Sequence, residues 1–225
     1  MSEEIAESTE AAERAPKEKK RFTILGIEVA YLYLFGIWIA HIGWLVENIA
    51  KAISSQHFID SRFHFLPFIW PYSLIIFAFH LVLRDPDDIV FFGKRIFPVN
   101  MKHAKLYSNI LSVFIMCSFV FLGELAVGNL WDVFFGVELW NYSSMPLNVT
   151  QYTSIFTTLG YGIGVFLIFK FIYKPILNQI RVKVNYTVAK VICFTLGVAI
   201  FLDTLYMMLS IMIFGEAPMY WSIHF

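Results

Sequence analysis

The chain has 225 residues, of which 58% are hydrophobic, 18% aromatic and only 15% charged. A soluble domain has about 45–50% apolar and about 25% charged residues, so this composition excludes a soluble globular enzyme, a disordered chain and a nucleic-acid binder with a basic face. The 17 basic and 17 acidic residues cancel, and the apolar excess gathers into runs of about 20 residues, which predicts an all-α polytopic membrane protein in a lipid bilayer.

The first segment, residues 1–21, differs from the rest of the chain. It contains no aromatic residue and one large aliphatic residue, Ile5, and it ends in a cluster of lysines and an arginine. Such a segment cannot bury a core. We therefore expect a disordered, charged cytoplasmic tail over 1–21 and a single transmembrane helical domain over 22–225.

Five apolar runs are long enough for membrane-crossing helices of roughly 20 residues. They cover about 24–50, 64–83, 107–127, 153–173 and 188–214. The second run is short and contains Pro67 and Pro71, so its outer end should be kinked or partly non-helical. The aromatic-rich connection 128–152 is predicted to form a short interfacial helix or re-entrant segment, followed by a turn at 144–146.

The basic residues alternate between the two sides of this arrangement. Fifteen of the 17 lie in the N-terminal tail, in 84–106 and around 170–190, whereas two lie in 51–63 and none in 128–152 or 215–225. Because basic residues are retained on the cytoplasmic side, we expect the N-terminus in the cytoplasm and the C-terminus outside. The basic segments could then contact a partner protein or anionic lipid.

Carboxylates within the spans are candidate functional groups, since an ionisable residue at membrane depth is costly. Glu47, Glu124 and Asp203 fall past the midpoints of helices that run outward, so they should share one leaflet. With no Lys or Arg at that depth, at least one should be protonated, paired with a histidine such as His41, or facing a bound cation. The alternative is that each is neutral or bonded to backbone and serves packing alone.

Small residues accompany these acids and indicate close helix contacts. Four glycines are predicted to be packing positions: Gly43, Gly128, Gly160 and Gly164. The first two lie four residues from Glu47 and Glu124 respectively, hence on the same helix faces, and the last two form a GxxxG pair. The six histidines and two cysteines have no metal-ligand spacing, so we expect neither a metal nor a cofactor.

Two motifs resemble those of a known family. Residues 43–47 read GWLVE, similar to a GWxxE motif, and 124–148 resemble the family's E…G…LWDYSxxPxN run, with Asn141 where the family usually has Asp. The chain resembles, over roughly 40–165, the putative ABC-transporter type IV (CmpB-like) family of small multi-pass membrane proteins. Since its members are mostly bacterial, the resemblance implies a bacterial or archaeal cytoplasmic membrane.

The resemblance implies the membrane component of a transporter, partnered with a separate ATPase subunit or with further copies of itself. It would take a cation or polar head group at an outward-facing acidic pocket. The substrate-binding candidates are Glu47, Glu124, Trp140, Asn141, Tyr142, Asn148 and Asp203. Two alternatives remain open: an enzyme acting on a lipid or isoprenoid, with paired carboxylates as acid and base, and a structural or accessory subunit. No catalytic residue is assigned.

Overall fold

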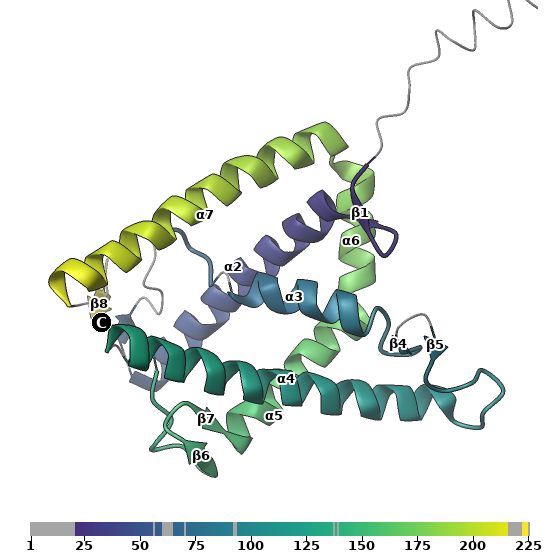
Figure 1. The fold of residues 1–225 in the computed structure, drawn as a ribbon, viewed down its shortest axis with the longest axis horizontal. Helices are drawn as coiled ribbons and strands as arrows, with labels where there is room; N and C mark the ends of the chain where they lie inside the picture. The colour runs from purple at the N-terminus through teal and green to yellow at the C-terminus, as the bar shows by residue number, and fades with distance from the viewer. Residues whose placement is uncertain are drawn as a thin grey trace, which may run out of the picture.

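The computed structural model describes residues 21–55, 57–59, 65–69, 71–91, 94–136, 138, 140–215 and 222–224. The tail expected over 1–21 lies, except for Arg21, outside the described residues. The helices are α2 (Val29–Ser55), α3 (Pro71–Val82), α4 (Ala104–Phe135), α5 (Ile155–Leu167), α6 (Lys174–Lys183) and α7 (Tyr186–Phe214), and a π-helical segment η1 (Ile168–Tyr173) joins α5 to α6 (Figure 1).

Four stretches of helix in the described residues are long and apolar enough to cross a membrane: Val29–Ile49, Ala104–Phe135, Ile155–Lys183 and Tyr186–Phe214. The prediction of an all-α polytopic membrane protein is therefore confirmed. The shorter apolar helix α3 has 12 residues, which extend about 18 Å at 1.5 Å per residue.

Short antiparallel pairs of strands connect the helices. The pairs are β1 (Thr23–Ile24) with β2 (Ile27–Glu28), β3 (His57–Ile59) with β8 (Ser222–His224), β4 (Val90–Phe91) with β5 (Lys94–Arg95), and β6 (Asn148–Thr150) with β7 (Thr153–Ser154). The first helix therefore begins at Val29 rather than near residue 24. Leu25 and Gly26 have φ of 50° and 82°, as the tight turn of a two-residue hairpin requires.

Five spans were expected, and the second of them, about 64–83, is not among the four long apolar stretches found in the described residues. It is only partly helical, as the prolines predict. Helix α3 starts at Pro71, and residues 65–69 run beside α2 as irregular backbone. Ile69 N–H donates to the Ala40 carbonyl at 3.2 Å, and His41 Nδ1 lies 2.8 Å from the Pro67 carbonyl oxygen. Irregular backbone is tolerated at membrane depth where the protein supplies its hydrogen-bond partners.

The connection predicted over 128–152 is divided differently. Residues 128–135 continue α4, so the expected separate short helix does not form there. Gly136 ends the helix with φ of 64°, and its N–H bonds to the Asp132 carbonyl, a common glycine C-cap. The loop between α4 and α5 includes the strands β6 and β7. The turn predicted at 144–146 is confirmed, with Met145 N–H bonded to the Tyr142 carbonyl at 2.8 Å.

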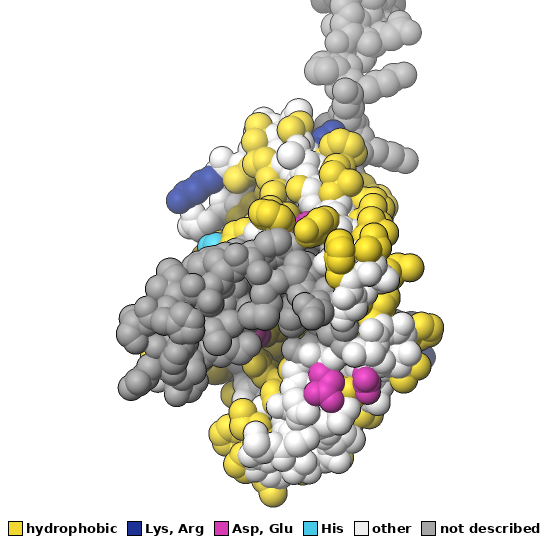
Figure 2. Space-filling view, turned by 90° about the vertical axis from the view of Figure 1, so that its left-hand side faces the viewer, with side chains coloured by type: hydrophobic (Ala, Val, Ile, Leu, Met, Phe, Trp, Pro, Cys, Tyr) yellow, Lys and Arg dark blue, Asp and Glu magenta, His cyan; other side chains and the backbone are white. Residues whose placement is uncertain are grey.

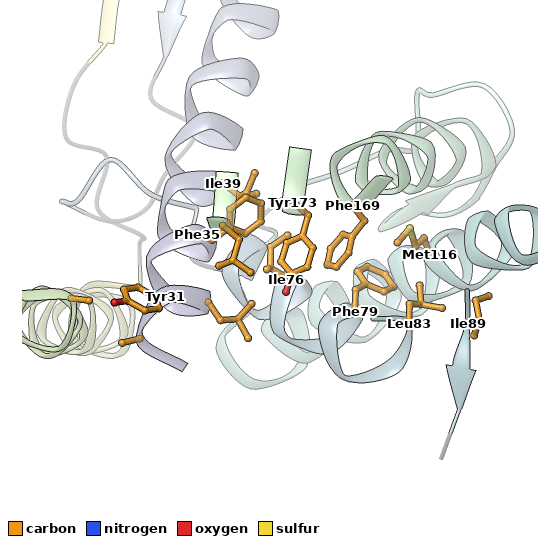
Figure 3. Packing of buried hydrophobic residues seen from close by; sticks show 14 residues of the cluster. Tyr31, Phe35, Ile39, Ile76, Phe79, Leu83, Ile89, Met116, Phe169 and Tyr173 are labelled. Atoms are coloured by element: carbon orange, nitrogen blue, oxygen red, sulfur yellow. The ribbon is translucent and has the colours of Figure 1, made fainter. Parts of the chain in front are cut away.

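Buried aromatic rings hold α2, α3 and η1 together (Figure 3). The Tyr173 ring contacts Phe35 edge-on at 5.2 Å between centroids and stacks on Phe169 at 4.8 Å. Phe79 of α3 packs against Phe169. The buried His80 bridges this cluster to the first hairpin, because its Nδ1 bonds to the Tyr173 hydroxyl and its Nε2 to the Ile24 carbonyl.

The helix ends form two chemically different ends of the molecule. The basic end comprises residues 21–28, 83–105 and 170–190. Here Glu28 pairs with Arg21 at 3.4 Å and Arg181 at 2.9 Å, which ties the first hairpin to α6. Burial alone would raise the pKa of Glu28, but a backbone hydrogen bond and the two arginines hold it below its ordinary value. The distal end comprises residues 43–47, 65–72, 124–161 and 203–215.

Candidate functional site

Helices α2 and α3 meet at the distal end through one carboxylate and one phenol. The Tyr72 hydroxyl donates to Glu47 Oε1. A Cβ built on Gly43 would clash with the Tyr72 ring, so the ring lies directly on this glycine. Residues four apart share a helix face, and the Gly43 face thus guides Tyr72 toward Glu47. The GWxxE spacing therefore has a physical reason.

Helix α4 repeats this arrangement with the loop that follows it. Glu124 accepts hydrogen bonds from the Tyr142 hydroxyl at 3.3 Å and from Thr153 Oγ1 at 3.1 Å. One turn further along α4, a Cβ on Gly128 would lie 2.6 Å from Tyr152 Cβ. The small residue thus allows the strand that carries Thr153 to lie against the helix and reach Glu124.

The loop 140–154 owes its shape to its own polar side chains. Trp140 Nε1 donates to the Tyr152 carbonyl at 2.8 Å. Asn141 accepts from Ser143 N–H at 2.8 Å, and its amide donates to Glu138 at 3.1 Å. Trp140 and Asn141 thus fix the loop that presents Tyr142 to Glu124. Asn148 is exposed at the start of β6, where it pairs in register with Ser154.

Tyr161 of α5 links the two halves, because its phenol lies within interaction distance of the Tyr72 and Tyr142 phenols. We call the five residues Glu47, Tyr72, Tyr161, Tyr142 and Glu124 the tyrosine–carboxylate network. Sequence reasoning selected three of them and missed Tyr72 and Tyr161. The position of Tyr72 directly after a helix-starting proline, and of Tyr161 inside the glycine pair, were the available signals.

The network contains two carboxylates and no basic side chain, and none of the ion pairs in the described ranges involves Glu47 or Glu124. Burial, together with the neighbouring Tyr161 and Glu124, raises the pKa of Tyr142 well above its ordinary value. Its hydroxyl therefore stays protonated and donates. Tyr161 is 39% exposed, so the described residues do not fully enclose its side chain.

Figure 2 faces the distal end. The largest visible acidic areas lie in its lower part, smaller ones show in the middle and upper parts, and Lys and Arg are visible in the upper part. Among the described residues, no group of three or more His, Cys, Asp and Glu is arranged to hold a metal ion.

Asp203 lies apart from the network and has its own partners. Its two carboxylate oxygens accept the backbone N–H groups of Phe65 and Leu66, each at 2.8 Å, and its side chain is buried. The structure therefore brings Glu47 and Glu124 together, whereas the side chain of Asp203, on α7, bonds to the irregular segment before α3. His41 likewise bonds to that segment, at Pro67, rather than to a carboxylate.

The glycines divide into two groups. A Cβ would clash at Gly43, at Gly128 and at Gly162, where it would lie 2.8 Å from Cys117 Cα. At Gly160 and Gly164 it would meet nothing within 4 Å among the described residues. The close contact between α4 and α5 is therefore at Gly162, the residue between the two that the GxxxG pattern selects.

One family model matches the chain. It is described as putative ABC-transporter type IV and covers residues 33–208, well over half of the sequence, including the whole tyrosine–carboxylate network and Asp203. No curated protein and no solved structure matches significantly.

Proposed function

Since the chain belongs to the putative ABC-transporter type IV family, we propose that it is the membrane component of a transporter that works with a separate ATPase subunit. The tyrosine–carboxylate network is the substrate site in this proposal, and its ligand is a cation or a cationic polar head group. The observation that carries the proposal is the convergence of Glu47 and Glu124, from helices distant in sequence, on neighbouring phenols: Tyr72 bonds to the first, Tyr142 to the second, and Tyr161 lies within interaction distance of both phenols.

Two properties of the network support a binding role. Phenol hydroxyls can rotate away from a carboxylate and leave its lone pairs to an incoming cation, because each hydroxyl both donates and accepts. Two carboxylates at membrane depth without a basic partner are costly, and a cation would relieve that cost. A purely structural contact between helices needs only one such group.

The orientation of the chain is part of the proposal: the distal end faces outside and the basic end faces the cytoplasm and the ATPase. A cysteine introduced at Ser144 should react with a membrane-impermeant maleimide in intact cells, whereas one at Lys94 should react only after lysis. The parent chain, with Cys117 and Cys193 in helices α4 and α7, gives the background. Labelling of the Lys94 variant alone in intact cells would reverse the orientation.

A thermal-shift panel tests the binding site. The purified chain is titrated with Na⁺, K⁺, Mg²⁺, Ca²⁺ and choline, and a bound cation at 100 times its Kd should stabilise the fold by about 2.7 kcal/mol. Glu47→Gln and Glu124→Gln should each abolish the shift. Glu138→Gln is the matched control, because Glu138 is an exposed acid just before the loop and a glutamine oxygen there can still accept the hydrogen bond from Asn141.

The transporter assignment has its own readout. The chain purified gently from its native membrane should carry a subunit with a Walker A motif, and its ATP hydrolysis should fall at least tenfold in Glu47→Gln and Glu124→Gln but not in Glu138→Gln. If the two network variants assemble and hydrolyse ATP like the parent, the carboxylates serve packing alone.

A further inference from the structure

An apolar groove runs between α2 and α7, well away from the tyrosine–carboxylate network. Its volume is about 590 Å³, within the 300–1,000 Å³ of small-molecule sites. Its principal lining residues are Phe22, Tyr33, Tyr186, Lys190, Gly197 and Phe201. From Tyr186 to Phe201 the α7 wall rises about 22 Å, which equals one leaflet of a bilayer about 40–45 Å thick with its head groups.

The end of the groove at the basic end is cationic. Lys190 Nζ lies 5.3 Å from the centroid of the Tyr186 ring, and the Arg21 guanidinium lies 5.2 Å from it. Arg21 shares Glu28 with Arg181, so one carboxylate faces two arginines there. Lys190 is exposed and pairs with no carboxylate in the described part of the chain, so a positive charge remains for a ligand.

The remainder of the groove is apolar and lies open. Phe194 and Phe201 on its α7 wall are 75% and 66% exposed. Helices α2 and α7 touch where Cys193 Sγ donates to the Ala30 carbonyl at 3.2 Å. At Gly197 an added Cβ would make only ordinary van der Waals contact, 3.8 Å from the Tyr33 hydroxyl, so the groove has room at this level. An apolar channel of one-leaflet length with a cation at the level of the head groups has the shape and charge of an acidic phospholipid.

We propose that this groove binds one anionic phospholipid from the leaflet at the basic end, with an acyl chain between α2 and α7 and the phosphate at Lys190. The ring of Tyr186 orients Lys190 through the cation–π contact between them. The bound lipid seals α7 to α2. This site is independent of the transport proposal, because it lies at the other end of the molecule and involves none of the network residues.

Lipid competition tests the charge requirement. The chain is reconstituted in nanodiscs containing equal amounts of phosphatidylglycerol and phosphatidylcholine, released by native mass spectrometry, and scored for retained lipid. The parent should retain one phosphatidylglycerol with at least tenfold preference. Lys190→Gln should reduce the preference to below about threefold, at roughly 1 kcal/mol per basic residue near the surface, Lys190→Arg should restore it, and Lys94→Gln, an exposed basic control, should leave it unchanged.

A second variant tests the groove itself. Gly197→Leu leaves room for its Cβ but fills the channel, so both phospholipids should be lost without loss of the folded chain in size-exclusion chromatography. Equal preference in the parent and in Lys190→Gln, or full retention in Gly197→Leu, would overturn the proposal. So would a mass of two chains without lipid, or lipid retention that appears only after deletion of residues 1–20, since the groove would then be covered by protein.

Discussion

Gly162→Ala should destabilise the protein by about 1–3 kcal/mol, the usual cost of overpacking a close contact. The added Cβ would lie 2.8 Å from Cys117 Cα and 3.0 Å from Cys117 N. Because these are backbone atoms, they cannot rotate away as a side chain would, and α5 must move off α4. The movement would displace Tyr161 from Tyr72 and Tyr142, so ligand binding at the network should fall as well.

The neighbouring glycines provide matched controls on the same helix. A Cβ at Gly160 or Gly164 would meet none of the described residues within 4 Å, and Ala is favoured over Gly in a helix by about 1 kcal/mol. The apparent melting temperature in detergent should therefore fall for Gly162→Ala and stay level or rise for the other two. The opposite order would mean that α4 and α5 touch through the GxxxG pair instead.

Asp203→Asn should cost about 2–3 kcal/mol, although the two side chains have the same shape. The carboxylate accepts the Phe65 and Leu66 N–H groups with one oxygen each, and bonds to a charged group are worth about 1.5–3 kcal/mol. An amide side chain offers one oxygen, so its NH₂ group would face the second backbone donor. One N–H of the irregular segment would remain unpaired inside the membrane.

Hydrogen exchange reads this effect locally. A peptide covering 65–69 should exchange faster in Asp203→Asn, while peptides from α4 and α5 stay protected. Thr204→Val is the neighbouring isosteric control, because the Thr204 hydroxyl bonds only to the carbonyl of its own helix at Ile200. Unchanged exchange at 65–69 in Asp203→Asn would show that this carboxylate does not hold the segment and would restore it as a ligand candidate.

Composition predicted the helical membrane fold, because the apolar excess acts over whole segments. A run of apolar residues becomes a helix in lipid wherever the chain allows it, since backbone groups have no other partner there. The observed helix boundaries differ from the predicted ones where a single residue determines the end of a helix. Leu25 and Gly26 form the turn of a hairpin before Val29, and Gly136 ends α4 after Phe135.

The candidate site was only partly predictable. Charge at membrane depth selected Glu47 and Glu124, and the glycine one turn away from each marked the contact that brings in a partner ring. The partners themselves could not be found this way. Tyr72 and Tyr161 carry no charge and occur among many aromatic residues of a lipid-facing chain, so only the packing of α3 and α5 reveals them.

Asp203 shows a different limit of sequence reasoning. Depth along the helix grouped it with Glu47 and Glu124, but depth does not specify direction around the helix axis. Its position on α7 points it to residues 65–66 rather than to Tyr161. A buried acid can serve backbone amides as readily as a substrate, and the sequence does not distinguish the two cases.

The π-helical segment η1 sets the directions in which the side chains of α5 and α6 point around their common axis. It lies just before Pro175 of α6, a residue that lacks an N–H and crowds the carbonyl four positions back. A π-turn contains an additional residue, which rotates everything after it by about 100° relative to a continuous α-helix. Tyr161 lies before this rotation and Arg181 after it. The inserted residue therefore sets the angle around the helix axis between the side chain that reaches the network and the side chain that pairs with Glu28.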